Sequence, residues 1–137
     1  MKRSVKRDDP QREALRKRVK QFYLRFNEED WAACYSMLDP QLTQQGKVDP
    51  AAFADQMQAF KKVYGRVQLW LTRLSLHLAV SAKQRDRRPF AYVYVIWQDG
   101  AHGFHMFRER WVEENGRWFT RVVGLVPNKS EAGSRQE

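Results

Sequence analysis

The sequence has very little cysteine and no long apolar segment. Cys34 is the one cysteine among 137 residues, which excludes an internal disulfide framework and a cysteine-based zinc cluster. The longest unbroken apolar run, Phe90 to Trp97, has eight residues, whereas a membrane-spanning helix needs about 20. The basic start, residues 1–7, has no apolar stretch behind it. We therefore expect no membrane span, no secretory signal and a cytoplasmic location.

Acidic residues are also scarce, since 16 Asp and Glu face 25 Lys and Arg and the net charge is +9. Residues 1–25 and 83–88 carry the whole excess. Such segments usually form a solvated helix face and loop, but they also attract phosphate polymers, anionic lipid or acidic proteins. Nucleic-acid-binding proteins usually add exposed aromatics, which here fall mostly in strand patterns. The candidate patch for an anionic partner is Arg12, Arg16, Lys20, Arg85, Arg87 and Arg88.

Length and composition indicate one folded domain. The chain is 42% hydrophobic and holds 5 Trp, 5 Tyr and 8 Phe, which excludes a disordered chain. Helix-start pairs at Asp9-Pro10 and Asp49-Pro50 open amphipathic patterns that end near Asn27 and Gly65. A short helix is expected over 30–38, and a brief strand or loop over 42–47. We expect a basic disordered arm over 1–8, one domain over 9–126 and a disordered tail over 127–137.

The second half of the chain predicts strands. A switch in alternation at Thr72-Arg73 is typical of a β-bulge in a long bent strand. Three further strands are expected over 90–98, 103–113 and 117–125, joined by turns at Asp99-Gly100 and Asn115-Gly116. The predicted fold class is α+β: three N-terminal helices packed on a strongly bent antiparallel sheet of four to five strands, forming a cone with a pocket.

Hairpin pairing predicts which side chains line that pocket. A two-residue turn at Asn115-Gly116 places Trp111 and Trp118 on one face and arginines on the other, so the tryptophan face packs inward. A two-residue turn at Asp99-Gly100 adds Phe90, Tyr92 and Tyr94 to that face, whereas a loop of three or five residues would reverse this assignment. The predicted lining is Phe22, Tyr23, Phe26, Tyr35, Phe90, Tyr92, Tyr94, Phe107, Trp111, Trp118 and Val122.

The same pairing leaves an apolar set on the opposite face. An exposed apolar patch on a strand pair usually marks a partner surface, and the simplest partner is a second copy across a two-fold axis. The predicted homodimer interface consists of Val93, Val95, Trp97, Phe104 and Met106.

Two polar residues fall on the predicted inner face and form a candidate acid/base pair. Glu109 and His105 are four residues apart on one strand, hence roughly 13 Å apart on the same side. Burial would raise the pKa of Glu109, which suits a general acid or base. Glu109 could instead pair with an arginine or sit at the rim, and His105 could be a core histidine bonded to Tyr23 or Tyr35. We expect no metal site and no cofactor, and Cys34 is interpreted as core filler.

The order of elements and three short motifs resemble a known superfamily. The motifs are Phe26-Asn27-Glu28-Glu29-Asp30-Trp31, Leu38-Asp39-Pro40 and the hairpin from Glu109 to Trp118. Over roughly residues 10–125 the chain resembles the nuclear transport factor 2-like superfamily (NTF2-like), a cone-shaped α+β fold that includes SnoaL-like polyketide cyclases, ketosteroid isomerases and scytalone dehydratases. The resemblance implies a conical pocket and frequent homodimers through the sheet. It implies no single activity, because the fold hosts enzymes, binding modules and assembly domains.

Three functional hypotheses follow. The first is a small homodimeric domain whose apolar, aromatic-lined pocket binds a small apolar molecule. The second is an isomerase, cyclase or dehydratase in which Glu109 is the base and His105 or a tyrosine stabilises oxyanion charge. The third is an assembly module that docks an acidic surface or nucleic acid through its basic first helix and the Lys83 to Arg88 loop.

Overall fold

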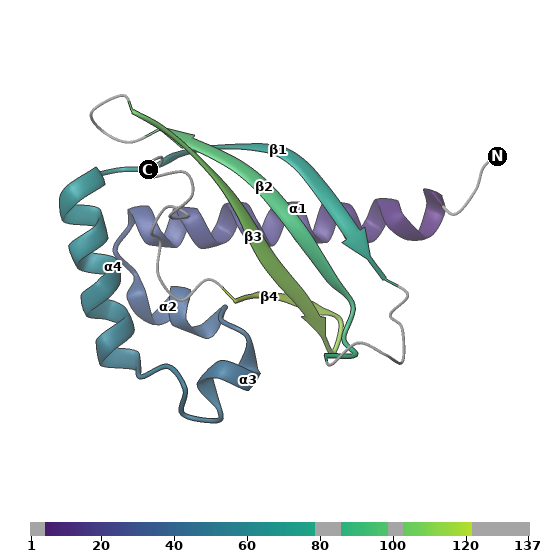
Figure 1. The fold of residues 1–137 in the computed structure, drawn as a ribbon, viewed down its shortest axis with the longest axis horizontal. Helices are drawn as coiled ribbons and strands as arrows, with labels where there is room; N and C mark the ends of the chain where they lie inside the picture. Colours follow the sequence, from purple (N-terminus) through teal and green to yellow (C-terminus); the bar gives the residue numbers. More distant parts are fainter. Residues whose placement is uncertain (1–4, 79–85, 99–102, 122–137) are drawn as a thin grey trace, which may run out of the picture.

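The structure, a computed structural model, describes residues 5–78, 86–98 and 103–121. Its elements in chain order are α1 (Val5–Asn27), α2 (Trp31–Ser36), α3 (Pro40–Thr43), α4 (Pro50–Tyr64), β1 (Gln68–His77), β2 (Phe90–Gln98), β3 (Phe104–Glu114) and β4 (Arg117–Thr120) (Figure 1). The predicted α+β class is confirmed, with helices packed on a curled antiparallel sheet. α3, a single turn, occupies part of the segment for which a brief strand or loop was expected.

Side-chain caps define where the shorter helices begin. The Asp30, Asp39 and Asp49 carboxylates each accept a hydrogen bond from a backbone N–H in the first turn of α2, α3 and α4. α4 is followed by Gly65 as its C-cap, whose positive φ of 75° suits glycine. α1 begins at Val5, so it includes residues 5–8 and starts before the helix start predicted at Asp9-Pro10. Proline keeps a helical φ and removes only its own N–H bond, so the helix continues through it.

The four described strands form one antiparallel sheet in the order β1-β2-β3-β4. The register of β1 shifts between Leu71 and Arg73, which places the bulge where the alternation predicts it. Asn115 and Gly116 have φ of 54° and 80° and join β3 to β4 by the predicted two-residue turn. An isolated parallel bridge between Leu38 and Thr120 attaches the chain after α2 to the far edge of the sheet.

The second hairpin corrects the predicted faces of β2. Gln98 pairs with Phe104, so the connection has five residues, 99–103, rather than two. This odd length reverses the parity of β2, because neighbouring residues on a strand point to opposite faces. The row that was expected to point outward faces α1: Ala91, Val93, Val95 and Trp97. The row that was expected to point inward lies on the opposite face: Phe90, Tyr92, Tyr94 and Ile96.

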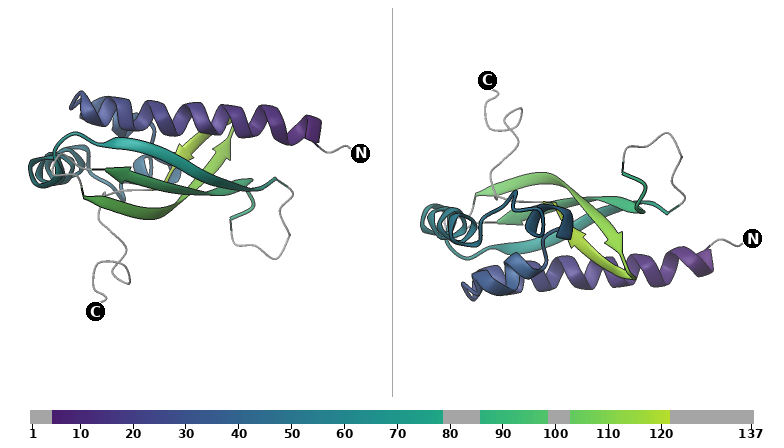
Figure 2. Two further views of the ribbon diagram at one scale, coloured as in Figure 1. Left: turned by 90° about the horizontal axis from the view of Figure 1, so that it is seen from above. Right: turned by 90° about the horizontal axis from the view of Figure 1, so that it is seen from below.

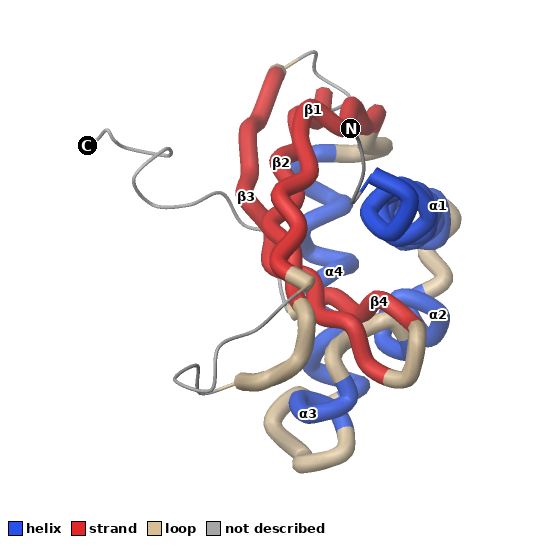
Figure 3. Tube along the Cα trace, turned by 90° about the vertical axis from the view of Figure 1, so that its right-hand side faces the viewer, coloured by secondary structure: helices blue, strands red, loops and turns tan. Residues whose placement is uncertain are grey.

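We call the face toward α1 the inner face and the opposite one the outer face. α1 runs along the inner face, and α2 and α4 lie on the same side of the sheet (Figures 2 and 3). The core between them is dense with aromatic rings, and Trp97, Trp111 and Trp118 are among its fully buried side chains. The Asn27 side chain bonds both backbone groups of Val67, which ties the end of α1 to the start of the sheet. No helix within the described residues is long and apolar enough to cross a membrane.

Candidate functional site

The first candidate is the buried carboxylate on the inner face. Glu109 is 3% exposed and accepts a hydrogen bond from the Tyr23 hydroxyl on one oxygen and from the Trp111 indole N–H, at 3.0 Å, on the other. Burial raises the pKa of Glu109, and these two hydrogen bonds oppose the rise. The carboxylate is thus enclosed by core residues that satisfy both its oxygens.

Tyr23 belongs to the same cluster and is itself enclosed. Burial, together with the charge and hydrogen bond of Glu109, raises the pKa of the Tyr23 hydroxyl well above its ordinary value. The Trp97 indole N–H acts in the opposite direction on that pKa. Its geometry nevertheless completes no hydrogen bond within the described residues, so this buried N–H is left without an acceptor. The carboxylate of Glu109 and the hydroxyl of Tyr23 therefore have hydrogen-bond partners in the core, and the Trp97 N–H beside them has none among the described residues.

His105 also lies on the inner face, opposite Trp97 on the neighbouring strand. Its half-buried ring packs edge-on against Tyr64, with centroids 5.0 Å apart, and against Trp97 at 5.1 Å. The two tyrosines that were expected to bond it have other acceptors, since Tyr23 donates to Glu109 and Tyr35 donates to the Val48 carbonyl at 2.7 Å. His105 therefore serves as an aromatic neighbour of the core.

The predicted pocket lining divides between the two faces. Those on α1 and the last hairpin are buried on the inner side: Phe22, Tyr23, Phe26, Trp111 and Trp118. Tyr35 and Phe107 are half-buried and pack against that core. The inward placement of Phe90, Tyr92 and Tyr94 was wrong, because the five-residue loop turns them outward. Val122 lies outside the described residues.

The predicted dimer interface divides in the same way. Val93, Val95 and Trp97 have no exposed surface and belong to the core, so their outward placement was wrong for the same reason. Phe104 and Met106 do lie on the outer face, where they are 67% and 60% exposed. The homodimer itself stays a prediction.

A second buried carboxylate anchors a network of arginines at the far end of the sheet. Asp39 is fully buried; it accepts two hydrogen bonds from Arg88, at 2.6 and 2.8 Å, and one from Arg121. Arg88 also donates to Asp86 and to Glu114, so all five of its guanidinium N–H groups have acceptors.

Charge pairing sets the pKa values in this network. Burial would raise the pKa of Asp39, but the hydrogen bonds from Arg88 and Gln41 and the charges of Arg88 and Arg121 outweigh it and leave that pKa lowered. The hydrogen bond from Arg88 lowers the pKa of Asp86, and those carboxylates in turn raise the pKa of Arg88. Arg88 therefore holds the fold together, and its place in a patch for an anionic partner stays a prediction.

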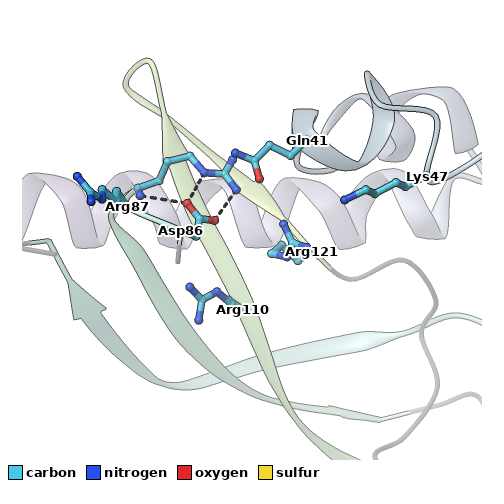
Figure 4. A pocket seen from close by; sticks show the side chains of 7 residues that line it. Gln41, Lys47, Asp86, Arg87, Arg110 and Arg121 are labelled. Atoms are coloured by element: carbon cyan, nitrogen blue, oxygen red, sulfur yellow. Dashed lines mark hydrogen bonds and ion pairs between the residues drawn. The ribbon is translucent and has the colours of Figure 1, made fainter. Parts of the chain in front are cut away.

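A polar groove opens beside this network, with a volume of about 950 Å³. Its walls come from the chain around α3, the segment before β2, β3, and Arg121 directly after β4. The lining residues are Gln41, Lys47, Asp86, Arg87, Arg88, Arg110 and Arg121. Figure 4 shows Arg110 and Arg121 near Asp86, with Lys47 farther along the groove beyond Arg121. Five of these side chains are basic and one is acidic, and that acid already binds Arg88.

The basic residues of the groove differ in how much of their charge is used. No described residue pairs with Lys47 or Arg87, which are both exposed. Arg110 lies over the Phe90 ring, 4.0 Å from its centre, and makes only a long hydrogen bond of 3.4 Å to the Tyr92 hydroxyl. One guanidinium N–H of Arg121 donates a hydrogen bond to Asp39. Several guanidinium and ammonium donors therefore face the groove with no acceptor among the described residues.

The predicted patch covers only part of this groove. Of its members, Arg87 and Arg88 line the groove, and Arg85 lies outside the described residues. The members on α1 lie elsewhere: Arg12 donates to the Leu74 carbonyl at 2.8 Å, Arg16 faces Glu13 at 3.7 Å, and Lys20 is exposed. Lys47, Arg110 and Arg121 were missed as a group, because no sequence pattern brings them together. For two of them the sequence holds one signal: the alternation of residues on the last hairpin predicts that Arg110 and Arg121 face solvent.

Two further chemistries find little support in the described residues. No group of three histidine, cysteine, aspartate or glutamate side chains there could hold a metal ion. Cys34 is buried, with Sγ 3.7 Å from the Phe22 carbonyl oxygen, and burial raises the pKa of its thiol to about 12. A thiol with that pKa stays protonated at neutral pH and is a poor nucleophile.

Comparison with known proteins adds no relative. No family model matches the chain, and no curated protein or solved structure matches it. The resemblance to the NTF2-like superfamily therefore stays a prediction, and the geometry of the groove carries the functional argument.

Proposed function

We propose that this protein is a docking module whose basic groove binds a phosphate-bearing polyanion. The observation that carries the proposal is the set of cationic side chains around one groove, with the single acid of its lining already paired to Arg88. Like charges repel when they have no counter-ion, so such a cluster is stabilised by an anion. In the cytoplasmic location that the sequence predicts, phosphate polymers would supply that anion.

The chemistry of the donors suits phosphate oxygens. Guanidinium groups present parallel N–H donors that match phosphate in a bidentate geometry. Arg110 is held flat against the Phe90 ring, so it loses less side-chain freedom on binding than an unsupported arginine. The Asp39–Arg88 network fixes the chain on either side of the groove, since Arg88 joins residues far apart in the sequence. Donors that have no acceptor and are held on a rigid frame favour the binding of an anion, whereas flexible surface side chains would be satisfied by water alone.

The other two hypotheses receive less support from the same geometry. An acid/base enzyme needs Glu109 within reach of a substrate, yet Glu109 is 3% exposed and both its oxygens are bonded to core residues. A pocket for an apolar ligand needs free volume, whereas Phe22, Phe26 and Trp111 are packed edge to face with their neighbours and are at most 1% exposed. Both hypotheses stay predictions.

The experiment is a salt series on a charge-matched pair of variants. Binding of inorganic polyphosphate is measured by calorimetry for the wild type, for Lys47→Gln/Arg87→Gln, and for Lys20→Gln/Lys62→Gln, which removes the same charge outside the groove. We expect wild-type affinity to fall steeply with salt, and the groove variant to lose roughly 10-fold or more in affinity and about 1 to 2 in the salt slope.

The control variant tests the location. We expect it to bind within about threefold of the wild type, because surface charges more than about 10 Å from a site are largely screened at 0.1 M salt. A flat salt response in the wild type would refute polyanion binding. An equal loss in both variants would show a diffuse charge effect, and a larger loss in the Lys20→Gln/Lys62→Gln variant would place the site outside the groove.

A further inference from the structure

The outer face of the sheet carries arginines laid over aromatic rings. Arg73 lies 4.2 Å from the centre of the Tyr94 ring, and Arg108 lies 4.5 Å from that of Tyr92. These distances are within the range of cation–π contacts. Neither arginine has a carboxylate partner among the described residues, and both are exposed. Each guanidinium is therefore held against the sheet by one face and keeps its N–H edge available.

One end of the same face is apolar. Trp70 is 41% exposed and Phe104 is 67% exposed, with their ring centroids 6.1 Å apart and their planes inclined by 31°. Met106, 60% exposed, follows on the same side of β3. Large rings left in water beside a positively charged row are unusual on a solvated surface, and they offer flat faces on which another ring can stack.

Arg110 connects this face to the groove. It belongs to the outer row of β3 and also lines the groove. From Phe104 to Arg110 the strand advances six residues, which is roughly 20 Å. The surface thus offers stacking rings at one end, two arginines in the middle and the phosphate-binding groove at the other end. This order of groups suits a chain that alternates flat bases with phosphates.

We propose that the polyanion is single-stranded nucleic acid, lying along the outer face with its phosphates on Arg73, Arg108 and the groove and its bases on Trp70 and Phe104. This inference rests on the proposed function and adds the class of ligand. Single strands bind where a basic track runs beside aromatic rings, because each unpaired base has a free face. A duplex keeps its bases stacked internally, and inorganic polyphosphate has no ring to stack.

A second copy of the chain is the main competing occupant of this face. In a two-fold interface the same surface meets itself, which would bring the arginines of both copies together without acids between them. Like charges placed opposite each other across an interface cost several kcal/mol. Charge complementarity therefore favours an anionic occupant over self-association at this surface.

The experiment compares two ligands on one pair of variants. A fluorescein-labelled single-stranded oligonucleotide of about 12 nucleotides, within the site sizes of such proteins, is titrated by anisotropy at fixed salt. Inorganic polyphosphate and the matching duplex serve as competitors. The test variant is Trp70→Ala/Phe104→Ala, and the control is Leu24→Ala/Val63→Ala, which removes exposed apolar side chains from α1 and α4 instead. Phe104→Ala alone, at the most exposed of these strand positions, guards against a folding defect.

We expect the test variant to lose roughly 5- to 100-fold in oligonucleotide affinity while its affinity for polyphosphate stays within about twofold. The control should match the wild type for both ligands, and the duplex should compete less well than the single strand. An unchanged oligonucleotide affinity in the test variant would overturn the stacking inference and leave polyphosphate binding intact. A duplex that binds as tightly, or a wild-type dimer in sedimentation that the test variant loses, would also overturn it. If the wild type binds neither ligand, the proposed function itself fails.

Discussion

The two faces of β2 have nearly the same apolar character and opposite surroundings. The inner row, represented by Val93 and Trp97, has no exposed surface. The outer row, represented by Tyr92 and Tyr94, lies beneath arginines from the neighbouring strands. β2 is apolar on both sides, so its own sequence does not show which side faces the core. The side is determined by its register with β3, because the β2 residues paired with the arginines of β3 lie on the same outer face as those arginines. This aromatic outer row under arginines is the surface on which we propose that the single strand lies.

The arginines show a parallel contrast. The Arg88 side chain is 14% exposed, and each of its guanidinium N–H groups donates to a carboxylate. Arg108 is exposed and bonds no carboxylate among the described residues. The same side chain therefore stabilises the fold in one place and offers free donors in another. The difference lies in whether buried carboxylates surround it.

The largest expected effect separates the two faces by tryptophan. Trp97→Ala should lower the free energy of unfolding by about 3–5 kcal/mol, because it empties a fully buried site against Phe60 and Phe107. Trp70→Ala, on the outer face of the same sheet, should cost about 1 kcal/mol, because much of its ring already meets water. Urea unfolding measures both. Equal losses would contradict the assignment of the faces.

The next effect separates the two kinds of arginine. Arg88→Ala should destabilise the protein by about 3 kcal/mol, because it leaves Asp39 buried with a single arginine partner. Arg87→Ala, one residue away and exposed, should change stability by about 0.5 kcal/mol. Thermal and urea unfolding of the two variants should therefore differ widely. Similar stabilities would show that the network contributes little.

Acid unfolding should report the same network. Arg88 lowers the folded pKa of Asp86, so the stability this carboxylate contributes is complete above its unfolded pKa of about 3.9 and is lost as the pH falls through the lowered value. In Arg88→Ala that loss should shrink, so the stability difference from the wild type should narrow at low pH. A difference that stays constant from pH 7 to acid would contradict a charge-based role for Arg88.

A smaller effect concerns the buried carboxylate of the inner face. Burial raises the folded pKa of Glu109, so the folded chain holds this proton more tightly than the unfolded chain does. The associated stability is complete below the unfolded pKa of about 4.3 and is lost as the pH rises through the raised value. Glu109→Gln cannot titrate and should remove that slope, with a difference of about 1 kcal/mol or less at low pH. The free energy of unfolding of the wild type and of Glu109→Gln is measured across this pH range. The same slope against pH in both proteins would contradict the raised pKa of Glu109.

The smallest effect on stability belongs to the outer face. Arg108→Gln should change the free energy of unfolding by about 0.5 kcal/mol, since it removes one exposed cation–π contact with Tyr92. Its affinity for the single-stranded oligonucleotide should fall severalfold, because a phosphate contact is lost. A variant that is strongly destabilised and yet binds normally would reverse the roles assigned to the two faces.

Local signals in the sequence predicted three of the four described helices, though not the start of the first, and one hairpin. The Asp49 cap and the Asn115-Gly116 turn depend on neighbouring residues alone, and the structure confirms both, whereas Asp9 of the other predicted helix start lies inside α1. The faces of β2 depend instead on the length of the connection after Gln98, where Asp99-Gly100 indicates a two-residue turn but the register requires five residues. An apolar strand on both sides gives no second signal to correct the error.

The groove could not be predicted because its parts are distant in the chain. Arg88 meets Asp39 and Glu114 only after the sheet has curled back to α3, across separations of 49 and 26 residues. Composition distinguishes neither a paired arginine from a free one nor an aromatic core from an aromatic surface. The basic character was visible in the sequence, and the surface that concentrates it was not.

The most direct test follows the tryptophan indole N–H signals in a nitrogen–proton correlation spectrum as single-stranded oligonucleotide is added. The account predicts that the signal of Trp70, on the outer face, shifts progressively while those of Trp97 and Trp111, enclosed on the inner face, remain in place. Shifts of the two inner signals with an unmoved Trp70 would place the ligand on the inner face and contradict the proposed binding surface.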